Sequence, residues 1–226
     1  MWIKICANTN LDDAQLAAEL GADAVGFVFA PSVRRVTAAQ VARITPYLPR
    51  RVERVGVFPA LEATDIAKAV EEAGLSAVQL HGGVRIALLR QLHKIFDSRV
   101  KLIQTVHWQV DADASAAVVA RQLREITAEG LTDRVLIDSK VGSATGGTGI
   151  SFDWNAARTT LVEAGTGLKL IVAGGLRHEN IADAIRRLNP WGVDVASGVE
   201  ESPGRKSPEK LSAFIHAARS STASPR

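Results

Sequence analysis

Cysteine is almost absent from this sequence, whose 226 residues include only one, Cys6. A single cysteine excludes a disulfide within the chain, and such scarcity is typical of proteins in a reducing compartment. No apolar run approaches the roughly 20 residues that cross a bilayer. The stretch from Met1 to Lys4 leads straight into a strand-like run, so we expect no signal peptide. We therefore predict a cytoplasmic protein with no membrane partner.

The chain also has little excess of charge of either sign. Lys and Arg number 27 against 24 Asp and Glu, which gives a net charge of +3. Because no run of five or more basic residues occurs, we expect no binding to nucleic acid. The histidines lack HExxH spacing and one cysteine cannot form a CxxC pair, so no metal site is predicted. The small positive balance suits an anionic small molecule, although incidental surface charge explains it more simply.

The chain does have a rhythm, in which a short apolar run and a helix-like stretch alternate eight times. The runs are continuously apolar, as in parallel strands that are buried on both faces. Eight such units of about thirty residues predict an α/β fold with a single (β/α)8 TIM barrel. We expect the barrel to span residues 1–219 and residues 220–226 to form a disordered tail. The predicted strands are 3–6, 24–29, 54–58, 77–80, 101–106, 134–138, 169–172 and 192–196.

Several of the helix-like stretches have recognisable ends. Thr37 is suited to cap a helix at 38–48, in which Pro46 indicates an early end or a distorted last turn. Gly21 is suited to follow the first helix, and Ser207 with Pro208 to begin the last. The other predicted helices are 11–20, 180–188 and 208–218.

Glycine-containing segments follow the last three predicted strands, at 146–149, 173–176 and 197–200. In barrels of this kind, the loops after the strands build the active site, and those after strands seven and eight commonly hold phosphate. Each glycine pair could instead only permit a tight turn, but three at adjacent strand ends favour a phosphorylated ligand. The predicted phosphate-binding residues are Gly146, Gly147, Gly149, Gly174, Gly175, Ser197 and Gly198.

Two groups at strand ends are suited to acid–base chemistry. Cys6 ends the first strand, where a thiolate could act as a base or nucleophile. The alternative is a small buried apolar residue. Asp138 ends the sixth strand, where loss of hydration would raise its pKa and make it a general acid. The alternative is a carboxylate that binds the backbone of the following loop.

Further polar residues lie at the same end of the predicted barrel. Arg34 and Arg35 follow the second strand, and a guanidinium there could grip a carboxylate through two parallel hydrogen bonds. His81 ends the fourth strand, where it could bind substrate or stabilise the rim. Asp194 lies within the eighth strand. The alternative for the arginines is incidental surface charge, which position alone favours. Position also favours the rim for His81, and we take His81 and Asp194 as candidates for substrate binding.

Taken in order, these residues resemble those of phosphoribosylanthranilate isomerase, a family of the tryptophan pathway. The resemblance spans the chain from Lys4 to about Ile215. It is carried by residues 4–9 (KICANT), 21–29 (GADAVGFVF), 31–35 (PSVRR), 55–58 (VGVF), 78–82 (VQLHG), 146–149 (GGTG), 152–154 (FDW), 173–176 (AGGL) and 193–200 (VDVASGVE).

The resemblance implies a cofactor-free Amadori rearrangement of N-(5-phosphoribosyl)anthranilate to 1-(2-carboxyphenylamino)-1-deoxyribulose 5-phosphate. It places the family's catalytic cysteine on Cys6 and its catalytic aspartate on Asp138. The arginine that contacts the anthranilate portion falls on Arg35, and the three glycine loops would hold the phosphate. The substrate is then a small phosphosugar, and the oligomeric state stays open.

One position departs from the family pattern, because Ala7 stands where glycine usually follows the catalytic cysteine. A positive φ there would cost on the order of 1 kcal/mol and shift the Cys6 thiol, whereas a negative φ would be harmless. Two alternative functions remain at this stage. One is another phosphosugar isomerase or epimerase on the same barrel, and the other is a phosphate-binding protein without catalysis.

Overall fold

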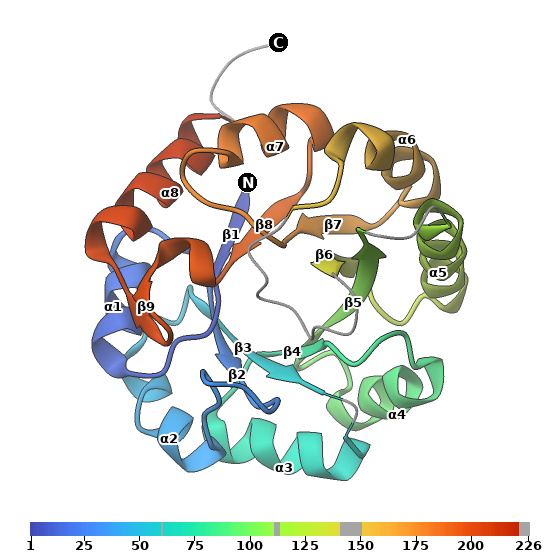
Figure 1. The fold of residues 1–226 in the computed structure, drawn as a ribbon. Coiled ribbons are helices and arrows are strands. Elements are labelled where there is room, and N and C mark those ends of the chain that lie inside the picture. Colours follow the sequence, from blue (N-terminus) through green and yellow to red (C-terminus); the bar gives the residue numbers. More distant parts are fainter. Residues whose placement is uncertain (60, 111–113, 141–150, 222–226) are drawn as a thin grey trace.

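The computed structural model describes residues 1–59, 61–110, 114–140 and 151–221, which form a closed barrel of eight parallel strands (Figure 1). The strands pair in chain order, and β1 closes the ring against β8. Helices surround them in the same order, with α8 beside α7 (Figure 1). The predicted (β/α)8 barrel is thus confirmed. No helix in these ranges is long and apolar enough to cross a membrane.

Six of the predicted strands match the observed ones to within one residue at each end. The other two, β5 and β6, run further, to Gln109 and Lys140. They pair with each other from Ile103↔Arg134 to Gln109↔Lys140. Because the last residues of both strands are mostly polar, the apolar runs did not predict this extension. The barrel strands are β1 Trp2–Ile5, β2 Ala24–Val28, β3 Glu53–Phe58, β4 Ala77–Leu80, β5 Lys101–Gln109, β6 Arg134–Lys140, β7 Lys169–Val172 and β8 Gly192–Val195.

The helix ends follow their capping residues. Thr37 and Gln40 form a capping box at the start of α2, which ends at Ala42. A separate 3-10 turn, η1, carries Pro46, so the predicted helix at 38–48 is two elements. This agrees with the disruptive effect of proline inside a helix. The helices are α1 Leu11–Glu19, α2 Ala38–Ala42, η1 Thr45–Tyr47, α3 Ala63–Ala73, α4 Ile86–Phe96, α5 Ser115–Glu129, α6 Trp154–Ala164, α7 Ile181–Leu188, η2 Ser197–Val199 and α8 Pro208–Ser220.

A short hairpin between η2 and α8 was not predicted. Its strands are β9 Glu200–Ser202 and β10 Arg205–Lys206, which pair antiparallel outside the barrel ring. Ser207 then caps α8, as expected. The helix continues through Ser220, and residues 222–226 of the predicted tail lie outside the described residues.

The inside of the barrel changes character along its axis. Its lower part, toward the N-terminal ends of the strands, is apolar and includes Trp2, Val55 and Leu136. Because side chains alternate along a strand, Lys4 and Cys6 share the inward face of β1 with Trp2. Gly26 on β2 makes room for them, since a Cβ there would lie 2.8 Å from Cys6 Sγ and 2.9 Å from Lys4 Cε.

Candidate active site

A cavity of about 560 Å³ opens at the C-terminal ends of the strands. This volume lies within the range of small-molecule binding sites. The predicted residues that line it are Cys6, His81, Asp138, Gly174, Gly175, Asp194, Ser197 and Gly198. Gly146, Gly147 and Gly149 lie outside the described residues, as does the loop at 141–149.

Cys6 shares its surroundings with a buried ion pair. Lys4 is fully buried, and its Nζ lies 2.8 Å from Asp194 Oδ1. Burial raises the pKa of the Cys6 thiol, while the ammonium of Lys4, which also hydrogen-bonds the sulfur, acts in the opposite direction. Burial lowers the pKa of Lys4, but Asp194 and Cys6 outweigh it, so this pKa is raised and the side chain stays charged. The thiol therefore has a permanent cation beside it.

Asp138 is the candidate acid of the site. Its side chain is buried, and burial raises its pKa to about 6, against the opposing charge of His107. Oδ2 lies 4.0 Å from His81 Nε2. The two histidine rings meet edge to face at 4.9 Å between centroids. A carboxyl group with this pKa retains its proton near neutral pH far more often than an ordinary aspartate does.

Two backbone turns form a concave surface on the β7 and β8 side of the cavity. Gly174 and Gly175 both have positive φ, of 86° and 64°. A Cβ on Gly174 would collide with Ser139, and one on Gly198 would collide with the carbonyl of Leu176. Turns of this kind commonly present backbone N–H groups, which suits an anion.

The turn after β7 is held by the side chain of Asn180, the residue that precedes α7. Asn180 Nδ2 donates to Gly175 O at 2.9 Å, and its Oδ1 accepts from the N–H of Arg177 at 2.9 Å. The shape of this concave surface is therefore set by protein contacts.

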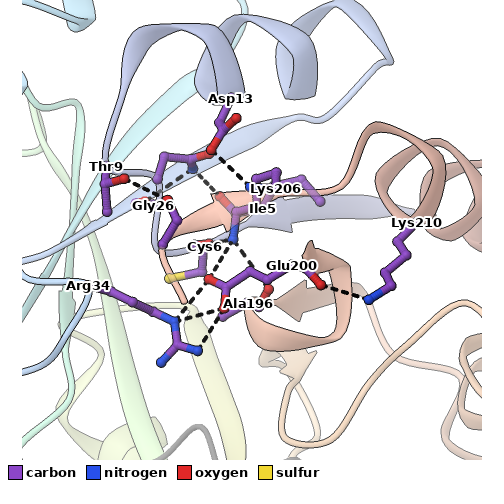
Figure 2. A network of polar contacts seen from close by, with 12 residues as sticks. Ile5, Cys6, Thr9, Asp13, Gly26, Arg34, Ala196, Glu200, Lys206 and Lys210 are labelled. Atoms are coloured by element: carbon purple, nitrogen blue, oxygen red, sulfur yellow. Dashed lines mark hydrogen bonds and ion pairs between the residues drawn. The ribbon is translucent and has the colours of Figure 1, made fainter. Parts of the chain in front are cut away.

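The two adjacent arginines take different places. Arg34 lines the cavity and grips Glu200, with Nη2–Oε2 at 2.7 Å and Nε–Oε1 at 2.9 Å (Figure 2). Arg35 is exposed and is not among the residues that line the cavity in the described part of the chain. The assignment of Arg35 to substrate binding thus stays a prediction, and Arg34 is the arginine that the structure brings to the site.

Sequence reasoning missed Lys4 and His107, although each had a signal. Lys4 is a charge inside an apolar run of a strand buried on both faces, two residues before Cys6 and hence on the same face. His107 was left outside the predicted fifth strand, which ended at Val106. Once β5 reaches Gln109, His107 stands opposite Asp138 in the strand register.

The fold and the cavity together define an α/β-barrel with a buried thiol, a buried carboxyl group of raised pKa and a glycine-rich concave turn at the C-terminal ends of its strands. A family model for N-(5'phosphoribosyl)anthranilate (PRA) isomerase matches residues 3–217. The N-(5'-phosphoribosyl)anthranilate isomerase of Acidithiobacillus ferrooxidans is 40% identical over 94% of this chain and 95% of its own length. The chain therefore belongs to the N-(5'-phosphoribosyl)anthranilate isomerase family, as the sequence resemblance predicts.

Solved structures agree with this assignment. Phosphoribosyl anthranilate isomerase from Thermotoga maritima superimposes with a TM-score of 0.82 at 35% identity, covering 97% of this chain and 99% of that one. A structure of phosphoribosyl anthranilate isomerase in complex with reduced 1-(o-carboxyphenylamino)-1-deoxyribulose 5-phosphate gives a TM-score of 0.78 at 34% identity. It covers 97% of this chain and 99% of that one.

Proposed function

We propose that this chain catalyses the Amadori rearrangement of N-(5-phosphoribosyl)anthranilate to 1-(2-carboxyphenylamino)-1-deoxyribulose 5-phosphate, a step of tryptophan biosynthesis. The observation that carries the proposal is the pairing of Cys6 and Asp138 in one cavity beside an anion-binding turn. Family membership and the product-like compound in a related structure support it. The chain's own residues supply all the proton transfers, so no cofactor is required. We expect a single-domain cytoplasmic enzyme with no nucleic-acid partner.

Asp138 acts first, as the general acid. It donates its proton to the ribose ring oxygen, the bond from that oxygen to C1′ breaks, and the nitrogen lone pair forms an iminium at C1′. The pKa of about 6 suits this step, because the proton is retained at neutral pH often enough to be delivered. A carboxylate with an ordinary aspartate pKa would be ionised nearly all the time.

Cys6 acts second, as the general base. Its thiolate removes the proton from C2′ and gives an enolamine, which becomes the ketone when the 2′-hydroxyl loses its proton and C1′ gains one. Burial raises the pKa of Cys6, so the thiolate needs cations nearby. Lys4 is one, and the iminium formed in the first step is another, which explains why ring opening precedes proton removal. Proton exchange with water returns both groups to their starting states.

The remaining groups hold the two ends of the substrate. The turns at Gly174, Gly175 and Ser197–Gly198 would bind the phosphate, together with the predicted glycines at 146–149. Asp194 and His81 would hydrogen-bond the sugar hydroxyls. Arg34 or Arg35 would face the anthranilate carboxylate.

The test is turnover of freshly generated substrate, followed as loss of anthranilate-type fluorescence, for the unmodified protein beside Cys6→Ser and Asp138→Asn. Removal of a general acid or base typically costs 10²–10⁴-fold, so we expect losses of about that size in kcat for each. Asp133→Asn is the matched control, because Asp133 is an exposed aspartate at the opposite end of β6. A protein that binds the reduced product but shows no turnover would instead be a binding protein. Turnover of a different phosphosugar alone would indicate the other isomerase class.

A further inference from the structure

The unpredicted β9–β10 hairpin places a buried lysine behind the Cys6 residue. Lys206 is 2% exposed, and its Nζ donates to the backbone carbonyl of Cys6 at 2.6 Å (Figure 2). It also lies 3.3 Å from Ala196 O and 3.3 Å from Glu200 Oε1. An ammonium group has three N–H donors, and these three acceptors match them. The geometry therefore accounts for every proton of this group.

The hairpin itself is anchored independently of that ammonium. The backbone N–H of Lys206 donates to Asp13 Oδ2 at 2.9 Å, and Lys210 Nζ donates to Glu200 O at 2.8 Å. Glu200 also keeps its bidentate partner Arg34. Loss of the Lys206 ammonium would thus leave the Glu200 carboxylate paired.

The carbonyl that Lys206 holds belongs to a strained peptide. Ala7 follows Cys6, is 1% exposed, and has φ of +63°. The left-handed conformation costs an alanine roughly 1–2 kcal/mol, so it persists only where surrounding contacts hold it. A charge-assisted hydrogen bond to the preceding carbonyl is such a contact.

We propose that Lys206 is a positioning residue that holds the strained Cys6–Ala7 peptide and so fixes the direction in which the Cys6 side chain enters the cavity. The proposal rests on the proposed role of Cys6 as the base. Lys206 is not among the residues that line the cavity in the described ranges, so it acts through Cys6 and does not touch the substrate. The proposal assigns a catalytic consequence to a hairpin outside the barrel.

Charge adds a second, separable effect. Burial raises the pKa of Cys6, whereas Lys4 on β1 and Lys206 on β10 lower it and Asp194 on β8 raises it. Arg34, from the loop after β2, is within electrostatic reach of the same thiol. Removal of Lys206 therefore raises the pKa of Cys6 further, and Lys4 remains as the nearest cation.

The experiment compares Lys206→Met with Lys210→Met, the matched control that binds the same hairpin without touching Cys6. Because Cys6 is the only cysteine, the pH dependence of alkylation by iodoacetamide reports this thiol alone. For Lys206→Met we expect kcat to fall by at least about tenfold with KM within about twofold, since Lys206 does not touch the substrate and a misaligned Cys6 slows the chemical step. We also expect the alkylation profile to move to higher pH. Lys210→Met should change neither.

Ala7→Gly separates geometry from charge. Glycine adopts positive φ without strain. The double variant Ala7→Gly with Lys206→Met should therefore regain at least about a third of the fall in log kcat that Lys206→Met causes alone. The alkylation profile should stay shifted, because the charge is still missing. Should Lys206→Met alone not fold, the same comparison is made in the Ala7→Gly background, where the shifted profile must still appear.

Two results would overturn the proposal: a folded Lys206→Met with unchanged kcat and alkylation profile, or equal losses in Lys210→Met. An unmodified protein without turnover would defeat the proposed function instead. The alkylation profiles would still decide whether Lys206 acts on Cys6.

Discussion

The two ends of the barrel are built from the same eight strands, yet they differ in almost every physical respect. At the N-terminal end, Trp2 stacks on Trp191 at 5.3 Å between ring centroids, and Arg134 lies over Trp191 at 5.1 Å. Arg134 also pairs with Glu53 at 2.6 Å. A cavity of about 430 Å³ at this end includes Lys101 and Asp133, whose charges are exposed to solvent. The inside of the barrel is apolar at this end, and the charges around it are paired or face solvent.

At the C-terminal end, the inward positions hold charges and strain. Lys4, Cys6, Asp138 and Asp194 are buried there, and burial displaces the pKa of Asp138 to about 6. Ala7 adopts a left-handed conformation that an alanine does not favour. Each of these features costs stability, and the proposed chemistry assigns roles to the buried Lys4, Cys6, Asp138 and Asp194. The comparison teaches that one end of the barrel stabilises the fold so that the other end can hold groups in unfavourable states.

The largest effect is expected at the stabilising end. Trp2→Ala removes the stacked ring from the bottom of the barrel, and truncation of a buried tryptophan typically costs about 3–5 kcal/mol. We expect a loss of this size in the free energy of unfolding, measured by urea denaturation. KM and kcat at low temperature should stay within about twofold for the folded protein. A fall in kcat without a loss of stability would mean that the two ends are not separable.

Gly174→Ala disrupts the turn that is proposed to bind phosphate at the other end. The added Cβ would collide with Ser139, and φ is +86° there. We expect KM to rise about a hundredfold or more, in line with the loss of close backbone contacts to phosphate. Gly167→Ala is the matched control, since Gly167 has φ of +85° with no atom near the added Cβ. Equal effects of both substitutions on KM would remove the role assigned to the Gly174 turn.

Asp138→Asn should lower kcat and raise the free energy of unfolding above pH 6. The folded pKa of about 6 lies above the usual aspartate value, so the folded protein binds a proton that the unfolded chain has lost. Stability contributed by this group is present below pH 4 and is lost as the pH rises through 6. The substitution removes this pH dependence. We therefore expect the change in unfolding free energy caused by Asp138→Asn to be more favourable at pH 8 than at pH 4, by on the order of 2–3 kcal/mol. Thermal unfolding at both pH values measures it, and an equal effect at the two would contradict the raised pKa.

The smallest effect is expected at Ala7. Ala7→Gly relieves the strain of positive φ. Two costs oppose this gain: glycine loses more conformational entropy on folding, and the buried methyl group of alanine is removed. We expect a change in unfolding free energy within about 1 kcal/mol. Ala18→Gly, at an equally buried alanine inside α1, should cost at least about 1 kcal/mol. A larger loss in Ala7→Gly than in Ala18→Gly would show that Ala7 is not strained.

The sequence alone predicts the fold well, because continuous apolar runs mark buried parallel strands and glycine or proline marks their boundaries. It predicts the strand ends less well where polar residues continue a strand, as at His107 and Gln109 in β5. The β9–β10 hairpin escaped notice because its few residues are mostly charged and its buried lysine resembles a surface one. Phe58 and Trp108 are buried in the core of this chain.

The residues of the site are likewise only partly predictable from the sequence. Residues at strand ends, such as Cys6 and Asp138, follow from the architecture, since all strand ends of a parallel barrel meet at one face. The choice between Arg34 and Arg35 does not follow, because the direction of a loop side chain depends on its tertiary partner, here Glu200. Lys4 required knowledge of which face of β1 points inward.

The most direct test of the contrast between the two ends is a titration of the aspartate carboxyl carbons by ¹³C NMR, with Asp138 assigned through Asp138→Asn. The account predicts one carboxyl group that titrates near pH 6 and vanishes in the variant. It predicts that Asp133, at the other end of β6, titrates below the usual range, because its hydrogen bond and ion pair with Lys169 outweigh its partial burial. An Asp138 signal that titrates near 4 would contradict the claim that burial at this end of the barrel raises the pKa of its acid.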